Sequence, residues 1–238
     1  MNPGPAPKGV CRAEGHVGSR WQNEAVTAFA PIIAALAAYL VGSLAFAVIV
    51  SRLMGLSDPR TFGSRNPGAT NVLRSGSKPA AVITLLLDAL KGFVPVLLVR
   101  LYGRQWGLEE GTVALVALAA FLGHLYPVFF RFQGGKGVAT FIGAVFGVHW
   151  LLGVGTGLTW LIIAFFFRYS SLASLVAAAF APVYYLIGDR IQWYAEASVA
   201  AALFVIAGLL AWRHRENIGR LLEGKESRLG AKKAAPSS

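Results

Sequence analysis

The sequence is poor in cysteine and in charged residues. Its single cysteine, Cys11, lies in a stretch near the N-terminus that is rich in Pro and Gly, so the chain offers no disulfide framework and no thiolate metal site. Only 14% of the 238 residues are charged, whereas 55% are hydrophobic; a soluble domain ordinarily has about a quarter charged residues. These shortages argue against thiol redox chemistry and favour a protein that crosses a membrane several times.

Acidic residues are half as numerous as basic ones, 11 against 22, which gives a formal net charge of +11. The Lys and Arg residues occur in loops between apolar segments rather than along one solvated face. The excess therefore indicates membrane topology and not nucleic-acid binding. Residues 1–26 lack the apolar core and cleavage site of a signal peptide, and we expect a disordered extension there. A membrane domain is expected over 27–226, followed by a flexible basic tail at 227–238.

Apolar runs dominate the rest of the chain. About 20 apolar residues are needed for one helical crossing, and the stretch from Val138 to Phe167 is too long for one crossing and short for two. Its glycines offer places to turn, and two helices there put most of the 22 Lys and Arg on one side, whereas one helix gives no clear asymmetry. The other candidate crossings are residues 27–53, 79–101, 112–130, 171–187 and 196–212. We therefore predict an all-α polytopic membrane protein with seven transmembrane helices, the N-terminus outside and the C-terminus cytoplasmic.

A glycine-rich segment, FQGGKGVAT at residues 132–140, follows the third predicted crossing. Gly134 and Gly135 let backbone amides approach a ligand, Lys136 adds a cation, and a helix starting at Val138 would direct its N-terminal dipole toward an anion. This combination suits a phosphate. The spacing is not that of a Walker A loop, so nucleotide hydrolysis has no support. A plain glycine turn with one topogenic lysine explains the segment about equally well.

The first polar segment along the chain, GSRNPGATNVLR, runs from Gly63 to Arg74 and is denser in hydrogen-bonding groups than the glycine-rich segment. Arginine can bind phosphate through two parallel hydrogen bonds, and amides and hydroxyls can hold a polyol. The grouping predicts a site for a small phosphorylated alcohol, although Asn, Pro, Gly and Ser also occur where a chain simply reverses. The candidate residues are Ser64, Asn66, Thr70, Asn71 and Arg74.

Further candidates lie at the predicted cytoplasmic ends of the sixth and seventh crossings. His214 and Asn217 are three residues apart, so on a helix they share a face and could contact one oxyanion beside Arg213 and Arg220. These arginines also suit anchoring to phospholipid headgroups.

Five other polar residues have two open interpretations each. Ser171 and Ser174 either line the site or cap a helix. Asp88 and Lys91 stand inside the second crossing, where they either neutralise each other or support the site. His124 suits interfacial packing as well as ligand contact.

Four segments together resemble the bacterial PlsY family: SRNPGATNVLR (64–74), GHLYPVFFRFQGGKGVAT (123–140), RYSSLASL (168–175) and HRENIGRLLEGKE (214–226). The resemblance covers about residues 30–226. It implies an enzyme that transfers a fatty acyl group from acyl phosphate to the 1-hydroxyl of sn-glycerol 3-phosphate, giving lysophosphatidic acid and inorganic phosphate. It also implies a multi-pass protein of the bacterial inner membrane whose site faces the cytoplasm, with no cofactor or metal. A functional link to the enzyme that produces acyl phosphate is expected.

The same resemblance implies roles for individual residues. Catalytic roles fall on Ser64, Lys136, His214 and Asn217. Together with the hydrogen-bonding groups of the two polar segments, the expected substrate-binding set is Arg74, Asn66, Thr70, Asn71, Gly134, Gly135, Gly137, Ser171 and Ser174. Acyl phosphate already carries a good leaving group, so direct attack suffices, with the acceptor's own phosphate assisting deprotonation. His214 stays open as an alternative base.

Two other classes of protein share some of these sequence features. A bundle with a lysine-bearing glycine loop could transport anions or organophosphates, but the polar groups gather on one predicted face and not at the bilayer midplane. A structural lipid-binding protein would not need such dense Asn, Ser and Gly chemistry. The HxxxxD pattern of another acyltransferase class is absent, because Phe129 follows His124 and Gly219 follows His214 at the required offset.

Overall fold

The computed structural model describes residues 14–230, and this range is helical. Its helices are α1 (Glu14–Gly42), α2 (Phe46–Leu53), α3 (Ala69–Leu73), α4 (Lys78–Tyr102), η1 (Gly103–Trp106), α5 (Glu110–Leu125), η2 (Val128–Phe130), α6 (Val138–Val148), α7 (Trp150–Phe167), α8 (Ser170–Ile187), α9 (Ala197–Arg213) and α10 (Arg215–Leu222). Between residues 14 and 230 the only β structure is an isolated bridge that joins Asp189 to Trp193. The predicted all-α class is confirmed.

Four helical segments are long and apolar enough to cross a bilayer, at residues 78–106, 110–130, 150–167 and 170–187. Two bent pairs raise the number to six if each pair is one span: α1 with α2, bent by 40°, and α9 with α10, bent by 61°. The short apolar helix α6 has 11 residues, fewer than a straight crossing needs. A multi-pass membrane protein is therefore established, and the seventh crossing stays a prediction.

The apolar stretch from Val138 to Phe167, which is too long for one crossing and short for two, is interrupted at His149. This residue has an extended backbone, with φ −158° and ψ 132°, and its imidazole Nδ1 accepts a hydrogen bond of 3.3 Å from the backbone N–H of Leu151. The side chain thus caps α7 and satisfies a free donor at the start of that helix. Two helices, α6 and α7, result, in agreement with the division favoured by the charge distribution.

The N-terminal boundary differs from the expected one. Helix α1 begins at Glu14, whereas the sequence predicted a disordered extension over residues 1–26. No proline occurs between Pro7 and Pro31, so the apolar helix extends toward the N-terminus, gaining one hydrogen bond for each residue added. The first 13 residues of the expected extension lie outside the described range, and so does most of the predicted basic tail, residues 231–238.

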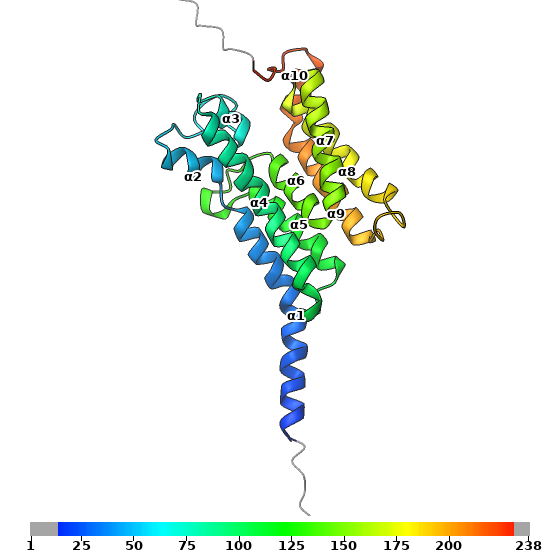
Figure 1. The fold of residues 1–238 in the computed structure, drawn as a ribbon. Coiled ribbons are helices and arrows are strands. Elements are labelled where there is room, and N and C mark those ends of the chain that lie inside the picture. The colour runs from blue at the N-terminus through cyan, green and yellow to red at the C-terminus, as the bar shows by residue number, and fades with distance from the viewer. Residues whose placement is uncertain (1–13, 231–238) are drawn as a thin grey trace, which may run out of the picture.

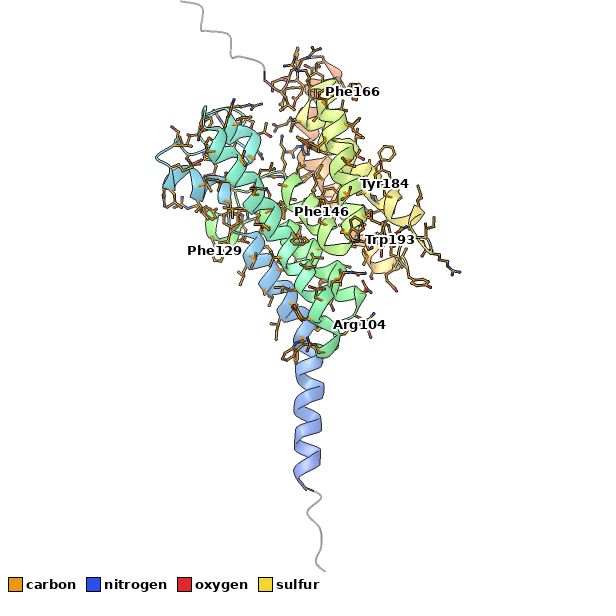
Figure 2. The ribbon with its side chains drawn as sticks, viewed as in Figure 1. Arg104, Phe129, Phe146, Phe166, Tyr184 and Trp193 are labelled. Carbon is orange, nitrogen blue, oxygen red and sulfur yellow. The ribbon has the colours of Figure 1, made fainter. Side chains whose placement is uncertain are left out.

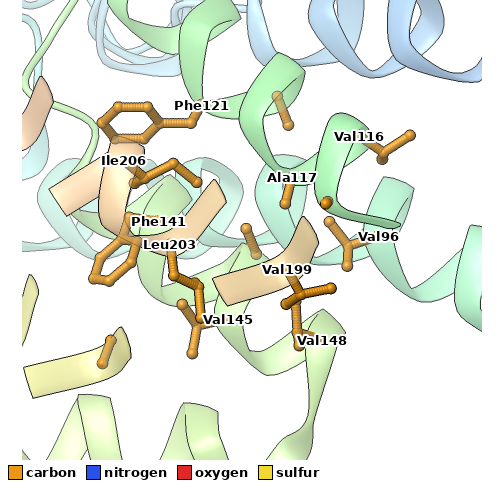
Figure 3. Packing of buried hydrophobic residues seen from close by; sticks show 14 of the residues in the cluster. Val96, Val116, Ala117, Phe121, Phe141, Val145, Val148, Val199, Leu203 and Ile206 are labelled. Atoms are coloured by element: carbon orange, nitrogen blue, oxygen red, sulfur yellow. The ribbon is translucent and has the colours of Figure 1, made fainter. Parts of the chain in front are cut away.

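The hydrophobic core lies between α4, α5, α6 and α9. Val96, Phe121, Phe141 and Ile206 come from these four helices and are fully buried (Figure 3). Glycines bring α4 and α6 into backbone contact: a Cβ atom at Gly92 would collide with a carbonyl oxygen of α6, and one at Gly143 with a carbonyl oxygen of α4. Close approach through small residues is typical of membrane helices. The start of α6 is therefore held rigidly against α4.

Large apolar side chains cover the outside of the bundle. Phe129 and Phe166 point outward and are 57% and 72% exposed (Figure 2). Helices α2, α3 and α10 lie at the end opposite to the projecting N-terminal half of α1 (Figure 1). Arg104 marks the other end of the bundle, near that projecting helix (Figure 2). Helices α3 and α10, which carry part of the predicted site, thus lie at the same end of the bundle.

Candidate active site

The loop between α5 and α6 carries Lys136 and depends on its glycines. The backbone N–H of Gly135 donates to the carbonyl oxygen of His124 at 3.2 Å. Any side chain at Gly134 or Gly135 would collide with His124, and Gly137 adopts a left-handed backbone with φ 82°. The conformation of this loop therefore requires glycine at all three predicted positions. The loop leads directly into the N-terminus of α6.

A polar cluster joins this loop to the C-terminal part of the chain. Lys136 Nζ donates a hydrogen bond to Asn217 Oδ1. Asn217 Nδ2 and Ser171 Oγ both donate to Glu226 Oε1, at 2.6 and 2.8 Å, and Arg220 Nε donates to Glu226 Oε2 at 2.7 Å. These five residues, from four parts of the chain, are called the polar cluster below. The cluster brings together Lys136, Asn217 and Ser171 of the predicted site.

Burial and charge set the protonation of the polar cluster. Burial lowers the pKa of Lys136 to about 8, although the nearby carboxylate of Glu226 acts in the opposite direction. Burial also disfavours the charged form of Glu226, but the hydrogen bonds from Asn217, Ser171 and Arg220 outweigh it and lower the pKa of this carboxyl group. Lys136 is therefore an ammonium group at neutral pH, but it loses its proton at a lower pH than an ordinary lysine does.

His214 lies at the bend between α9 and α10 and is 3% exposed. Its Nδ1 is 2.8 Å from the carbonyl oxygen of Leu210. A carbonyl oxygen only accepts, so the hydrogen of the neutral ring is on Nδ1 and Nε2 carries the free lone pair. This arrangement leaves Nε2 of His214 able to accept a hydrogen bond from a hydroxyl group.

Arg213 holds the glycine loop from the side of α9. Its Nη2 donates to the carbonyl oxygens of Gly134 and Gly135, both at 3.0 Å, and its Nε donates to that of Gly135 at 3.2 Å. Sequence reasoning assigns Arg213 only a general role near an oxyanion, because spacing within one helix does not reveal a partner in a distant loop. An adjacent hollow of about 420 Å³ is lined by Arg60, Arg65, Pro67, Phe132, Gln133, Gly134 and Arg213.

The first polar segment is organised by Asn71, which is 1% exposed. Its Nδ2 donates to the carbonyl oxygens of Pro59 and Phe62, at 2.6 and 3.1 Å, and its Oδ1 accepts from the backbone N–H of Ser64 at 3.1 Å. Both amide hydrogens of Asn71 are thus used within its own loop. The side chain fixes the loop that carries Ser64, and the substrate contact predicted for Asn71 stays a prediction.

The other predicted residues of this segment differ in their exposure and in their hydrogen-bond partners. Ser64 and Thr70 are exposed, whereas Asn66 is half-buried. Arg74 Nη2 donates to Ser227 Oγ at 2.9 Å, across 153 positions of the sequence. Since Ser227 follows Glu226 directly, this contact brings the first polar segment close to the polar cluster.

The two candidate serines have different partners. Ser174 Oγ donates to the carbonyl oxygen of Ser170 at 2.7 Å and accepts from Trp160 Nε1 at 3.1 Å. Ser171 Oγ instead belongs to the polar cluster. Of the two, Ser171 is therefore the serine placed beside the other predicted site residues.

Glu226 was not a predicted site residue, since it marked only the end of the expected membrane domain. A turn after α10 returns it to the cluster: Gly224 has a left-handed backbone with φ 68°, and the backbone N–H groups of Lys225 and Glu226 both donate to the carbonyl oxygen of Arg220. Glycine just beyond a helix is the signal that could have indicated this reversal. Across residues 14–230 no group of three or more His, Cys, Asp or Glu side chains is placed to hold a metal ion.

The apolar bundle and its polar cluster define a class: an integral membrane protein with a site at one end that can handle anions. Cations, amides and hydroxyls of that site converge from segments far apart in the sequence.

Comparison with known proteins identifies the particular family. The family model described as glycerol-3-phosphate acyltransferase matches residues 32–224, and the chain belongs to this family, PlsY. It is 65% identical over 209 residues to the glycerol-3-phosphate acyltransferase of Albidiferax ferrireducens, covering 88% of this chain and 93% of that protein. It is 62% identical over 196 residues to that of Bordetella petrii, covering 82% and 92%.

Two solved structures share the fold. The crystal structure of PlsY, an integral membrane glycerol 3-phosphate acyltransferase, in its glycerol 3-phosphate form is 40% identical with a TM-score of 0.77, and the match covers 84% of this chain and 96% of that one. Its lysophosphatidic acid form is 39% identical with a TM-score of 0.75 over the same shares. The predicted PlsY family membership is confirmed.

Proposed function

We propose that this protein transfers a fatty acyl group from acyl phosphate to the 1-hydroxyl of sn-glycerol 3-phosphate, giving lysophosphatidic acid and inorganic phosphate. The polar cluster is the observation that carries the proposal, because it joins Lys136 of the glycine loop to Asn217 and Ser171. The names of the related proteins and the two related structures, one in a glycerol 3-phosphate form and one in a lysophosphatidic acid form, support the acceptor and the product.

In this proposal one group of residues binds the acyl donor and another binds the acceptor. Lys136 and the amide of Gly134 hold the acyl-phosphate group and stabilise its developing negative charge, while the N–H of Gly135, which donates to the His124 carbonyl oxygen, fixes the loop. Arg74 and His214, together with Asn217, Ser64 and Ser171, orient the phosphate and hydroxyls of the acceptor, while Asn66, Thr70, Asn71, Gly137 and Ser174 shape the surrounding binding surface. Orientation of two bound reactants lowers the barrier without a covalent acyl-enzyme.

The chemical step is a direct displacement. The 1-hydroxyl oxygen of glycerol 3-phosphate forms a bond to the acyl carbonyl carbon, and the bond from that carbon to the phosphate oxygen breaks. Inorganic phosphate leaves, and the hydroxyl proton passes to the acceptor's own phosphate. His214 is the alternative base, because its Nε2 carries the free lone pair.

The proposed setting is the bacterial inner membrane, with seven crossings, the N-terminus outside and the site facing the cytoplasm. The bias of Lys and Arg toward one set of loops supports this orientation. The acyltransferase domain extends over 27–226, and the acyl chain of the donor lies among the helices. The enzyme that forms acyl phosphate supplies the donor.

The test uses the purified full-length protein in lipid vesicles with acyl phosphate and glycerol 3-phosphate. Release of inorganic phosphate with an equal amount of lysophosphatidic acid is expected, and omission of either substrate should abolish both products. Replacing acyl phosphate with acyl-CoA tests the donor, and formation of lysophosphatidic acid from acyl-CoA alone would contradict the proposed donor. Movement of glycerol 3-phosphate into the vesicles without acylation would favour a transporter instead.

A further inference from the structure

A buried ionic network lies directly behind the glycine loop. Lys91 Nζ and Asp88 Oδ1, both from α4, are 2.8 Å apart, and their side chains are 1% and 4% exposed. The same carboxylate oxygen is 3.7 Å from Nδ1 of His124, which lies in the last turn of α5 and is 6% exposed. Ionisable groups in apolar helices are costly to bury, so a paired set usually serves a function.

His124 connects this network to the glycine loop through its backbone and its ring. Its carbonyl oxygen accepts from the N–H of Gly135, and Thr140 Oγ1, in the first turn of α6, is 3.2 Å from Nδ1. The ring lies directly against Gly135, because a Cβ atom there would collide with His124 Nε2 and stand 2.9 Å from the carbonyl oxygen of Pro67. The imidazole therefore supports the loop at the place where it meets the first polar segment.

The other end of the network reaches the break in the first membrane segment. Lys91 Nζ donates to the carbonyl oxygen of Leu44 at 2.7 Å, between α1 and α2, and lies 5.6 Å from the centre of the Phe46 ring. Helix α4 is also fixed to α6 by the close contact of Gly92 with the carbonyl oxygen of Thr140. The ionic network thus ties together three segments that surround the glycine loop.

Two buried atoms of the network have no hydrogen-bond partner within residues 14–230: Nε2 of His124 and Oδ1 of Asp88, which is 2.8 Å from Lys91 Nζ in the ion pair. A buried polar atom without a partner is destabilising, and such atoms in native proteins call for an explanation. If His124 served only for packing, an apolar side chain at this position would make the folded protein more stable. The observed ring is held instead between a carboxylate and the glycine loop.

We propose that Asp88 and His124 are positioning residues for the glycine loop, with Lys91 holding the Asp88 carboxylate in place. The carboxylate orients the imidazole, and the imidazole fixes the backbone of Gly134 and Gly135 so that the Gly134 amide and Lys136 face the donor phosphate. The kinetic part of this inference rests on the proposed function. Its structural part, an ordered loop that depends on a buried ion pair, does not.

The competing explanation is that Asp88 and Lys91 only neutralise each other. Replacing both at once separates the two ideas, because the double variant D88L/K91M leaves no buried charge and nearly preserves side-chain volume. Neutralisation alone predicts a folded enzyme with normal kinetics. Positioning predicts a folded enzyme whose KM for acyl phosphate rises about 10-fold or more, with a smaller change in kcat, since a displacement on the order of 1 Å in a binding group has large effects.

The experiment compares D88L/K91M, His124→Asn and the wild type in lipid, by steady-state kinetics and by hydrogen exchange of the loop peptide. Faster exchange at residues 133–137 is expected in both variants, with unchanged exchange in α9. His124→Asn keeps the ion pair intact, so it tests the loop even if the double variant does not fold. D88N/K91M, which restores an oxygen acceptor beside His124, should recover part of the loss in KM.

The matched control is R100Q/E110Q, which neutralises the 2.9 Å ion pair at the far end of α4. It should change neither the KM nor the loop exchange. Wild-type KM and wild-type loop exchange in D88L/K91M or in His124→Asn would overturn the positioning role. If the wild type makes no lysophosphatidic acid, the proposed function fails, and the exchange comparison still decides the positioning of the loop.

Discussion

Lys136 and Asn217 are 81 positions apart in the sequence, and the Lys136 ammonium group donates a hydrogen bond to the Asn217 side-chain oxygen. The contact joins the glycine loop to α10, so a cation and an amide face one location. Glu226 orients the amide from the other side by accepting from its Nδ2 at 2.6 Å. A ligand phosphate that enters this location meets donors that are already in place, which reduces the cost of ordering them on binding.

The first prediction concerns the cation itself. In the proposed reaction the Lys136 ammonium group stabilises charge on the donor phosphate, so turnover of Lys136→Ala should fall about 100-fold or more. Phosphate release in lipid vesicles measures the loss, and thermal unfolding checks that the protein is folded. Lys78→Ala is the matched control, because Lys78 is exposed at the start of α4. Near-normal turnover of Lys136→Ala would remove this residue from the reaction.

The pH dependence follows from the same lysine. Burial lowers the pKa of Lys136 to about 8, so the empty site loses its positive charge as the pH rises through 8 and not near the usual value of 10.5. A bound dianion favours the charged form, so KM for acyl phosphate should increase between pH 7 and 9 while kcat at saturation changes less. Lys136→Arg stays charged over this range and should lack the increase. A flat KM in the wild type would contradict the assignment.

A coupled prediction concerns Glu226, whose negative charge raises the pKa of Lys136. Glu226→Gln keeps a side-chain oxygen near Asn217 and Ser171 but removes the charge, so the alkaline rise in KM should move to lower pH. The measurement is the pH profile of KM for wild type and variant. Glu223→Gln, in an exposed pair with Lys225, serves as the control and should leave the profile unchanged. An identical profile for Glu226→Gln would show that the charge does not act on Lys136.

A stability prediction follows from the hydrogen bonds of Asn71. Asn71→Ala leaves the carbonyl oxygens of Pro59 and Phe62 without this donor, and the free energy of unfolding should fall by about 1 to 3 kcal/mol. Thermal unfolding in detergent measures the change. Thr70→Ala, exposed in the same short helix, is the control and should have a small effect. Unchanged stability of Asn71→Ala would contradict the loop-fixing role.

The sequence predicted the helices well, because runs of apolar residues and the turns between them are local features. It also selected Lys136, Asn217 and Ser171, which do converge. Arg213 was only partly understood and Glu226 was missed, since their partners lie in other segments and no spacing reveals them. Asn71 was ambiguous for a chemical reason: the same amide can bind a polyol or hold a loop. The start of α1 was misplaced because a polar helix next to an apolar one has the composition of a disordered extension.

The two serines allow a paired test within one helix. Ser171 Oγ donates to Glu226 in the polar cluster, whereas Ser174 Oγ is used by Ser170 and Trp160. Ser171→Ala should therefore lower turnover, about 10-fold, through loss of an oriented hydrogen bond, with little change in thermal stability. Ser174→Ala should leave turnover near the wild-type value and lower the stability slightly, because the indole N–H of Trp160 loses its acceptor. Both variants are compared by phosphate release and thermal unfolding in the same lipid. The reverse pattern, with turnover lost only in Ser174→Ala, would place the substrate on the other side of α8.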